Sequence, residues 1–189
     1  MKRSLSTYEN EIVHQIILAE LCLVACEMTP VIAGQGENFN SYFYNLNISK
    51  AIGTLHSLLR PTQKETSLLL YIKGYEKQIS TRQGYEDFCA ETSSLIQCFK
   101  NELSNMRHKV VSHIDPGFKH TDFTTGYMLP EKLPILIEIC SKLKESFFRF
   151  TNHAPYMGHE NIRKKIALVI EDANKESLAR ASNSDTIDL

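Results

Sequence analysis

Several features that often identify a protein's function are missing from this 189-residue chain. No stretch approaches the roughly 18 consecutive apolar residues that a membrane-spanning helix requires, so we expect no membrane span. The formal net charge is −1, which provides no overall positive field to attract nucleic acid or an anionic membrane. Any surface that binds a polyanion must therefore be a local patch of positive charge.

Motifs for metals and nucleotides are also missing. There is no G-x-G-x-x-G sequence, no P-loop and no usable Ser-His-Asp pattern. The cysteines are odd in number and include no C-x-x-C pair, which is typical of small buried apolar side chains in a reducing compartment. We therefore expect no zinc site, no other metal and no cofactor. The five cysteines are Cys22, Cys26, Cys89, Cys98 and Cys140.

The N-terminus resembles a signal peptide only briefly. Two cations, Lys2 and Arg3, are followed by Glu9 and Glu11, and Glu20 interrupts the apolar run that comes after them. Acidic residues in this region are not compatible with a secretory signal peptide. The chain is therefore predicted to be cytoplasmic.

Helical periodicity of apolar residues recurs along the chain, whereas no β-hairpin signal and no sustained alternation of period two is present. The first helical run ends at Thr29-Pro30, and it is apolar nearly all round from Ile16 onward. This pattern predicts a central, buried helix. The second run is predicted to be one helix ending at Arg60-Pro61.

Three patterns of the capping-box type predict helix starts. The third opens the longest predicted helix, which extends to about Ile114. Residues along that helix step by three and four positions, which predicts a stripe facing the core. The capping patterns are Ser6 with Glu9, Thr62 with Glu65, and Ser80 with Gln83, and the stripe consists of Phe88, Thr92, Leu95, Phe99, Leu103, Met106 and Val110.

Two further helices are predicted after the long one. The first runs from about Pro130 to Phe150, and the second is amphipathic and carries apolar residues from Ile162 to Ala173. We expect residues 1–180 to form a single all-α domain, a bundle of five or six helices. Residues 181–189 are polar and are predicted to form a frayed tail.

Titratable and cationic residues gather at the predicted end of the longest helix, in the sequence N-M-R-H-K-V-V-S-H-I-D-P-G. Asp115 precedes Pro116, which pushes it out of the helical region, so the helix must loosen there. Cations in the last turns of a helix are stabilised by its dipole, by roughly 0.3 to 1 kcal/mol each. This interpretation explains Arg107, His108, Lys109 and His113 without any catalytic role.

The same residues also supply the groups that a metal-free ribonuclease needs. A histidine such as His113, which titrates near neutral pH, can take a proton from a ribose 2′-hydroxyl and return it. Arg107 can bind the scissile phosphate through two parallel N–H hydrogen bonds, and it remains charged while the transition state forms. On one ideal helix these two residues are about 120° apart in azimuth and about 9 Å apart along the axis. A loosened last turn and a second copy of the chain would bring them to one phosphate.

The stretch R-H-K-V-V-S-H-I-D resembles the signature of the HEPN superfamily, in which an Arg and a polar residue are followed by several residues and then a His. It is most similar to the abortive-infection U-type branch of that superfamily. The specific motif covers nine residues, from Arg107 to Asp115. The expected layout of helices resembles the family over most of residues 1–180.

This resemblance implies a helical bundle that pairs as a homodimer, with the motif helices of the two protomers facing each other. Arg107 and His113 would then be the catalytic residues of a composite site that cleaves RNA. His108 would be a helper, Asp115 could fix the tautomer of His113, and Lys109 could contact RNA phosphate. The family also implies a toxin or phage-defence role, and an antitoxin or regulatory protein as a further partner.

Two alternatives stay open. The near-neutral charge favours a non-catalytic module of the same family that binds RNA, a nucleotide or a protein, because polyanion binding usually needs more positive surface. A plain dimerising helical scaffold is the other. Other histidines are expected to be structural or on the surface: His14 and His56 within helices, and His120, His153 and His159 in loops.

Overall fold

The computed structural model describes residues 3–29, 39–60, 66–110, 132–154, 163–173 and 175, with the side chains of residues 39, 41 and 102–110 left aside. This part of the chain contains six helices and no strand, which confirms the all-α prediction. No helix within it is both long and apolar enough to cross a membrane. The helices are α1 (Leu5–Met28), α2 (Phe39–Leu59), α3 (Leu68–Ile79), α4 (Tyr85–Val110), α6 (Leu133–Thr151) and a further helix over residues 163–173.

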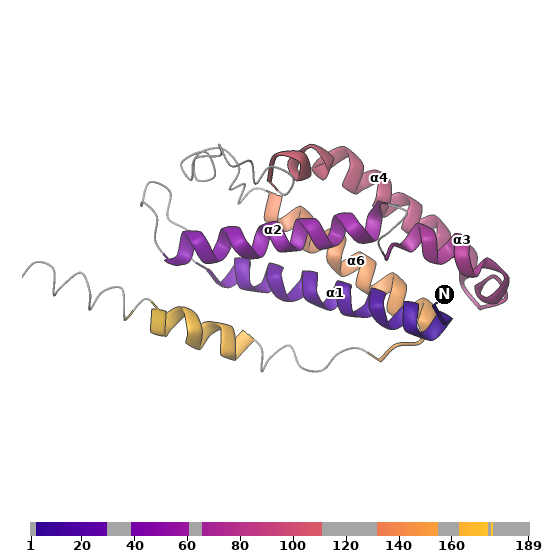
Figure 1. Ribbon diagram of the computed structural model, residues 1–189, viewed down its shortest axis with the longest axis horizontal. Coiled ribbons are helices and arrows are strands. Elements are labelled where there is room, and N and C mark those ends of the chain that lie inside the picture. The colour runs from indigo at the N-terminus through magenta and orange to yellow at the C-terminus, as the bar shows by residue number, and fades with distance from the viewer. Residues whose placement is uncertain are drawn as a thin grey trace, which may run out of the picture.

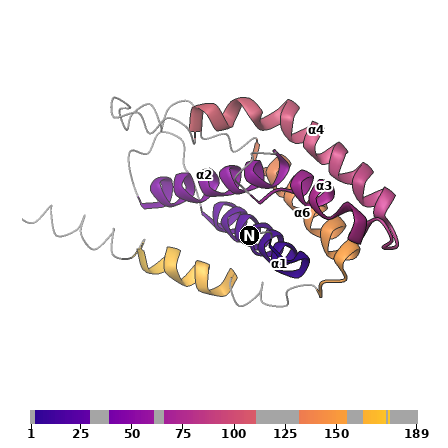
Figure 2. The same ribbon diagram turned by 45° about the vertical axis from the view of Figure 1, so that its right-hand side comes forward.

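Four of these helices form an elongated antiparallel bundle (Figure 1). α1 and α4 each pack against both α2 and α6, so the four helices surround one core. The short helix α3 lies at the end of the bundle that contains the N-terminus (Figure 1), and both views show it beside the start of α4 (Figure 2). Because the chain runs up and down, residues far apart in the sequence meet at each end of the bundle.

The first helix is buried as its sequence predicts. Ile12, Ile16 and Ala19 are fully buried, and they belong to the single core cluster that also takes in α2 and α6. Burying an apolar side chain of this size contributes roughly 1.5 to 3 kcal/mol. α1 ends at Met28, and Thr29 caps it by donating its backbone N–H to the carbonyl of Cys26.

An aromatic cluster fills the end of the core near α3. Tyr71 of α3 contacts Phe147 of α6, with ring centroids 5.6 Å apart in an edge-to-face arrangement. Phe88 of α4 stacks on Phe150 of α6 at 4.3 Å with nearly parallel rings. The predicted stripe on α4 is confirmed for Phe88, Thr92, Leu95 and Phe99, all of which are buried.

The helix starts differ from the three predicted capping patterns. α1 begins at Leu5 with Ser4 as its N-cap, and Ser4 Oγ accepts a hydrogen bond from the Thr7 N–H. α3 begins at Leu68 with Ser67 as its N-cap rather than at Thr62, which lies outside the described residues together with Glu65. The patterns were misleading because serine, threonine and glutamate are common near helix starts whatever their exact register.

The third pattern was wrong for a different reason. Ser80 is the C-cap of α3, and its N–H donates to the carbonyl of Glu76. A short turn then leads to Gly84, whose φ of 78° lies in the left-handed region that glycine tolerates best. α4 therefore begins at Tyr85, five residues after Ser80.

The remaining helices follow the sequence closely. α2 is one helix ending at Leu59, and α6 ends at Thr151, where Asn152 adopts a left-handed conformation as the C-cap. On the helix over residues 163–173, Ile170 is buried, whereas Leu168 and Val169 are exposed. Arg163 of this helix pairs with Glu27 of α1 at 3.1 Å. The predicted tail, residues 181–189, lies outside the described residues.

Candidate functional site

The motif residues lie at or beyond the end of α4. Arg107, His108 and Lys109 belong to the last turns of the helix, but their side chains are not among those described. His113 and Asp115 lie outside the described residues altogether. The distance between Arg107 and His113 therefore stays a prediction, as does their arrangement across a dimer.

The structure does describe what holds α4 in place before the motif. Phe99 is buried, and its ring meets the buried ring of His56 of α2 at 6.1 Å, edge to face. His56 is thus a core residue, as predicted from the sequence. About two turns before Arg107, α4 packs against both α2 and α6. These contacts fix the direction of α4 up to the point where the motif begins.

The outer face of α4 is polar and open. Gln97, Cys98, Lys100 and Asn101 are all exposed, and Gln97 donates a hydrogen bond to Asn101 at 2.7 Å. This face follows from the helical period, because the residues between the buried stripe positions point away from the core. A partner molecule can therefore approach α4 without disturbing the core.

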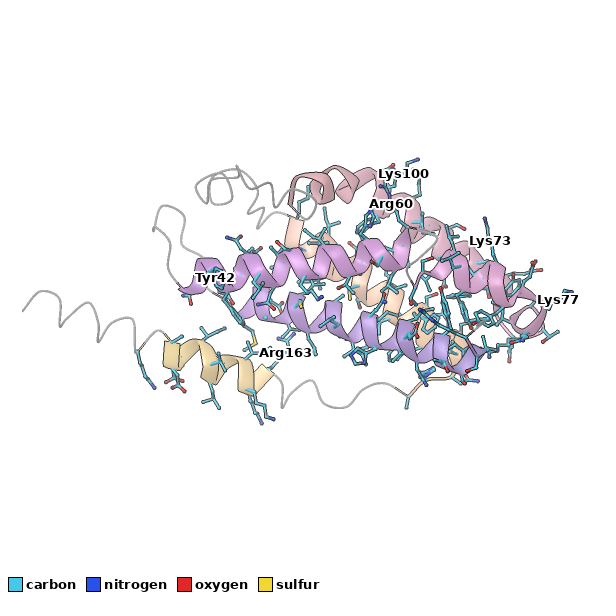
Figure 3. All side chains as sticks on the ribbon, in the orientation of Figure 1. Tyr42, Arg60, Lys73, Lys77, Lys100 and Arg163 are labelled. Atoms are coloured by element: carbon cyan, nitrogen blue, oxygen red, sulfur yellow. The ribbon has the colours of Figure 1, made fainter. Side chains whose placement is uncertain are left out.

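Two cations lie on the same edge of the bundle as this face, and two more lie at the end of the bundle formed by α3 (Figure 3). Figure 3 labels Arg60 at the end of α2 and Lys100 on α4, with Lys73 and Lys77 farther along on α3. The contact between His56 and Phe99 brings the end of α2 close to Lys100. Lys73, Lys77 and Lys100 are exposed, and Arg60 is half-buried. Arg60 and Lys100, which lie close together (Figure 3), form a small local positive surface on a chain with nearly no net charge.

A buried polar network near the N-terminus of α1 was not predicted. Glu9 is only 8% exposed, and its Oε1 accepts hydrogen bonds from Tyr71 Oη and from Arg82 Nη1, each at 2.6 Å. Burial and the hydrogen bond to the Glu9 carboxylate raise the pKa of Tyr71. The sequence did contain a signal, because Glu9 falls three and seven positions before Ile12 and Ile16 on the buried stripe of α1.

A cleft of about 950 Å³ lies beside this network, between the start of α4 and the end of α6. Arg82 and Arg149 both line it, and Arg149 pairs with Glu91 across it at 2.5 Å. A second, shallower cleft of about 610 Å³ lies on the other side of Arg149 and contains an ion pair between Lys144 and Glu20 at 2.9 Å.

Neither the thiols nor the histidines form a recognisable reactive centre in the part of the chain that the structure describes. Burial raises the pKa of Cys140 to about 12, and burial with the neighbouring Cys22 thiol does the same for Cys26, so both thiols stay protonated and unreactive at neutral pH. His153 shares hydrogen bonds with Thr151 at 2.8 Å and Asn10 at 3.4 Å.

The described residues contain no group of three His, Cys, Asp or Glu side chains able to hold a metal ion. His14 is exposed on α1, while His120 and His159 lie outside the described residues.

Comparison with known proteins gave no match to any family model, curated protein or solved structure. Interpretation of the function therefore rests on the residues of this chain.

Proposed function

We propose that this protein is a metal-independent endoribonuclease of the HEPN type, with a composite active site at a homodimer interface and a role as a toxin or phage-defence effector. The observation that carries the proposal is the nine-residue sequence from Arg107 to Asp115, which begins in the last turn of α4. Arg107 holds the scissile phosphate, and His113 moves the proton of the ribose 2′-hydroxyl. The product is a 2′,3′-cyclic phosphate.

The fold supports this proposal in two respects. α4 has 26 residues and is the longest of the described helices, and its buried stripe fixes it against α2 and α6 ahead of the motif. The exposed outer face of α4 leaves room for a second protomer and for RNA. His108 and Asp115 act as supporting residues, and Lys109 contacts the RNA backbone.

The local positive surface supports RNA as the substrate. Arg60 and Lys100 lie on the edge of the bundle that α2 and α4 share, close to where the motif begins (Figure 3). Phosphate contacts from arginine and lysine supply most of the affinity of proteins for nucleic acid, irrespective of its sequence. Because the net charge is −1, binding of a polyanion requires local positive charge, and these two cations supply it.

The proposal is tested by incubating the protein with total RNA or tRNA in EDTA. Cleavage should survive chelation and should be lost, by at least about 100-fold, in His113→Ala and Arg107→Ala, because proton transfer and phosphate stabilisation each contribute about that much. Lys142→Ala is the matched control, since Lys142 lies on α6 in an exposed pair with Glu138. Wild-type protein that leaves all RNA intact would contradict the proposal.

A second candidate function is a non-catalytic module that binds RNA, a nucleotide or a protein partner. The balance of 21 basic and 22 acidic residues favours it, because a nuclease that grips a polyanion usually has more positive charge. An electrophoretic mobility shift with RNA that stays intact over hours would support this function over the first. Sedimentation at micromolar concentration adds an independent test, since the composite site requires a dimer.

A further inference from the structure

The cleft between α4 and α6 lies at the opposite end of α4 from the motif. Asp87, which lines the cleft, precedes Arg107 by 20 positions in the same helix. At the rise of an α-helix this separation is about 30 Å. The cleft has three sides: the turn before α4, the first turns of α4 and the last turns of α6. It is therefore separate from the site proposed for RNA cleavage.

One side of the cleft carries a guanidinium held in a fixed position. Arg82 Nη1 donates to Glu9 and lies 3.4 Å from Tyr71 Oη, and the guanidinium carbon sits 5.7 Å from the centre of the Phe150 ring. None of the described hydrogen bonds uses Nε or Nη2 of Arg82. An arginine that is already ordered loses little entropy on binding a ligand, and its remaining N–H groups suit an oxyanion.

The opposite side carries a second guanidinium whose partner is easily exchanged. Arg149 Nη2 contacts both carboxylate oxygens of Glu91, at 2.5 and 2.7 Å. Both side chains are exposed, at 58% and 41%, and such solvent-screened pairs contribute little to stability. A phosphate entering the cleft can therefore compete with Glu91 for Arg149.

A buried serine is among the residues that line the cleft. Ser146 lines the cleft and is only 4% exposed, and its Oγ has no hydrogen-bond partner among the described residues. Leaving a buried hydroxyl without a hydrogen bond is energetically unfavourable. A ligand oxygen would supply the missing partner where binding moves aside the groups that cover Oγ.

The acidic residues of the cleft restrict the kind of ligand. Asp87 and Glu91 offset the charge of the two arginines, and Asp87 in the first turn of α4 already interacts with the positive end of the helix dipole. A highly charged anion such as a triphosphate is therefore disfavoured. A ligand is favoured if it combines one phosphate with hydroxyl or amino groups that donate to these carboxylates.

We propose that this cleft binds a nucleoside monophosphate, with the phosphate between Arg82 and Arg149 and the hydroxyl or amino groups near Asp87. A volume of about 950 Å³ is sufficient for such a ligand. The phosphate belongs either to a free nucleotide or to the phosphorylated end of an RNA. The inference does not require that the protein cleave RNA, so the two proposals can fail separately.

The test is calorimetric titration of the full chain carrying His113→Ala, which prevents any cleavage from interfering. The probes are AMP, adenosine, and a short RNA with either a 5′-phosphate or a 5′-hydroxyl. AMP or the phosphorylated RNA should bind, and each should bind at least tenfold more tightly than its form without phosphate. The tighter binder of the two identifies the source of the phosphate.

Variants locate the binding in the cleft. Arg149→Gln should weaken binding about 10-fold to 100-fold, because hydrogen bonds to charged groups contribute about 1.5 to 3 kcal/mol. Ser146→Ala should weaken binding several-fold while the melting temperature stays the same or rises, since the hydroxyl has no partner to lose. Arg163→Gln, which disrupts the exposed pair with Glu27 on α1, is the matched control and should leave the affinity unchanged.

Three results would overturn the proposal. The first is no binding of AMP or phosphorylated RNA at millimolar concentration. The second is equal affinity of the phosphorylated probe that binds and its form without phosphate, which would mean that the phosphate is not recognised. The third is equal affinity of the Arg149→Gln and Arg163→Gln proteins, which would place the ligand outside the cleft.

Discussion

Glu9 of α1 and Arg82 of the turn before α4 form an ion pair of 2.6 Å, although 73 positions separate them in the sequence. Glu9 also accepts the hydroxyl of Tyr71 from α3, so one carboxylate joins three segments of the chain. The side chains of Glu9 and Arg82 are 10% and 30% exposed. This network fixes the position of α4 at the end that faces the cleft.

Removing the carboxylate should destabilise the protein strongly. Glu9→Ala leaves Arg82 partly buried without its partner and Tyr71 Oη without its acceptor, and breaking such a pair typically lowers the free energy of unfolding by about 3 to 5 kcal/mol. Urea unfolding at pH 7 measures the change. Glu138→Ala, which disrupts an exposed pair on α6, should have a much smaller effect, because solvent screens that pair. Equal effects of the two substitutions would show that the network does not stabilise the fold.

The N-cap of α1 provides a second test, at two neighbouring serines. Ser4→Ala should lower the free energy of unfolding by about 1 kcal/mol, because Ser4 Oγ accepts the Thr7 N–H at the start of the helix. Ser6→Ala should have little effect, since Ser6 is exposed and already lies inside α1. Thermal unfolding of both variants distinguishes the two positions. A larger loss for Ser6→Ala would place the helix start where the sequence pattern put it.

These two serines show the difference between predicting a helix from the sequence and predicting its first residue. Apolar periodicity predicted the existence and order of the helices, because it reports directly which face of each helix is buried. The first residue of each helix was harder to predict. Ser4 and Ser6 both precede apolar residues, and only the structure shows which hydroxyl accepts a hydrogen bond from a backbone N–H. Helix ends were easier to predict where a proline occurs. Thr29-Pro30 and Arg60-Pro61 each lie directly after the end of a helix.

The candidate sites differ in how predictable they were. The motif of Arg107 and His113 lies within seven residues of sequence and could be found by inspection. The cleft of Arg82, Ser146 and Arg149 could not, because α6 comes together with the turn before α4 only when the bundle forms. Long-range pairing of this kind leaves no local pattern in the sequence.

Two buried thiols and one buried phenol should make the protein less stable at alkaline pH. The folded-state pKa of Cys26, Cys140 and Tyr44 is raised to about 12 by burial, from 9 for the thiols and 10 for the phenol. Above pH 9 the unfolded chain loses these protons while the folded chain keeps them, so the free energy of unfolding falls as pH rises from about 9 to 12. Urea unfolding across this range measures the slope.

A single variant isolates the contribution of one thiol. Each such proton contributes up to about 1.4 kcal/mol per pH unit, and Cys26→Ala should reduce the slope by about that amount. Cys98→Ala is the matched control, since Cys98 is exposed. In the native wild-type protein at pH 8, a thiol reagent should label Cys98 and should label Cys26 and Cys140 only after unfolding. Rapid labelling of Cys140 in the folded protein would contradict the burial seen here.

The local positive surface at Arg60 and Lys100 should contribute to RNA binding. Arg60→Gln and Lys100→Gln should each weaken binding to RNA of any sequence and reduce the slope of log affinity against log salt by about 1. Fluorescence anisotropy at several salt concentrations measures both quantities. Arg163→Gln removes a cation from a different part of the surface (Figure 3) and should change neither. An unchanged salt slope in the Arg60 and Lys100 variants would place the RNA elsewhere.

The chemistry of the RNA ends distinguishes a metal-independent nuclease of the HEPN type from other ribonucleases. Purified wild-type protein is incubated with a labelled RNA in EDTA, and the product termini are identified by mass spectrometry. We expect 2′,3′-cyclic phosphates that are absent when His113→Ala replaces the wild type, because transesterification needs a proton acceptor and no metal. Products with 3′-hydroxyl ends, or cyclic ends formed equally well by His113→Ala, would contradict this expectation.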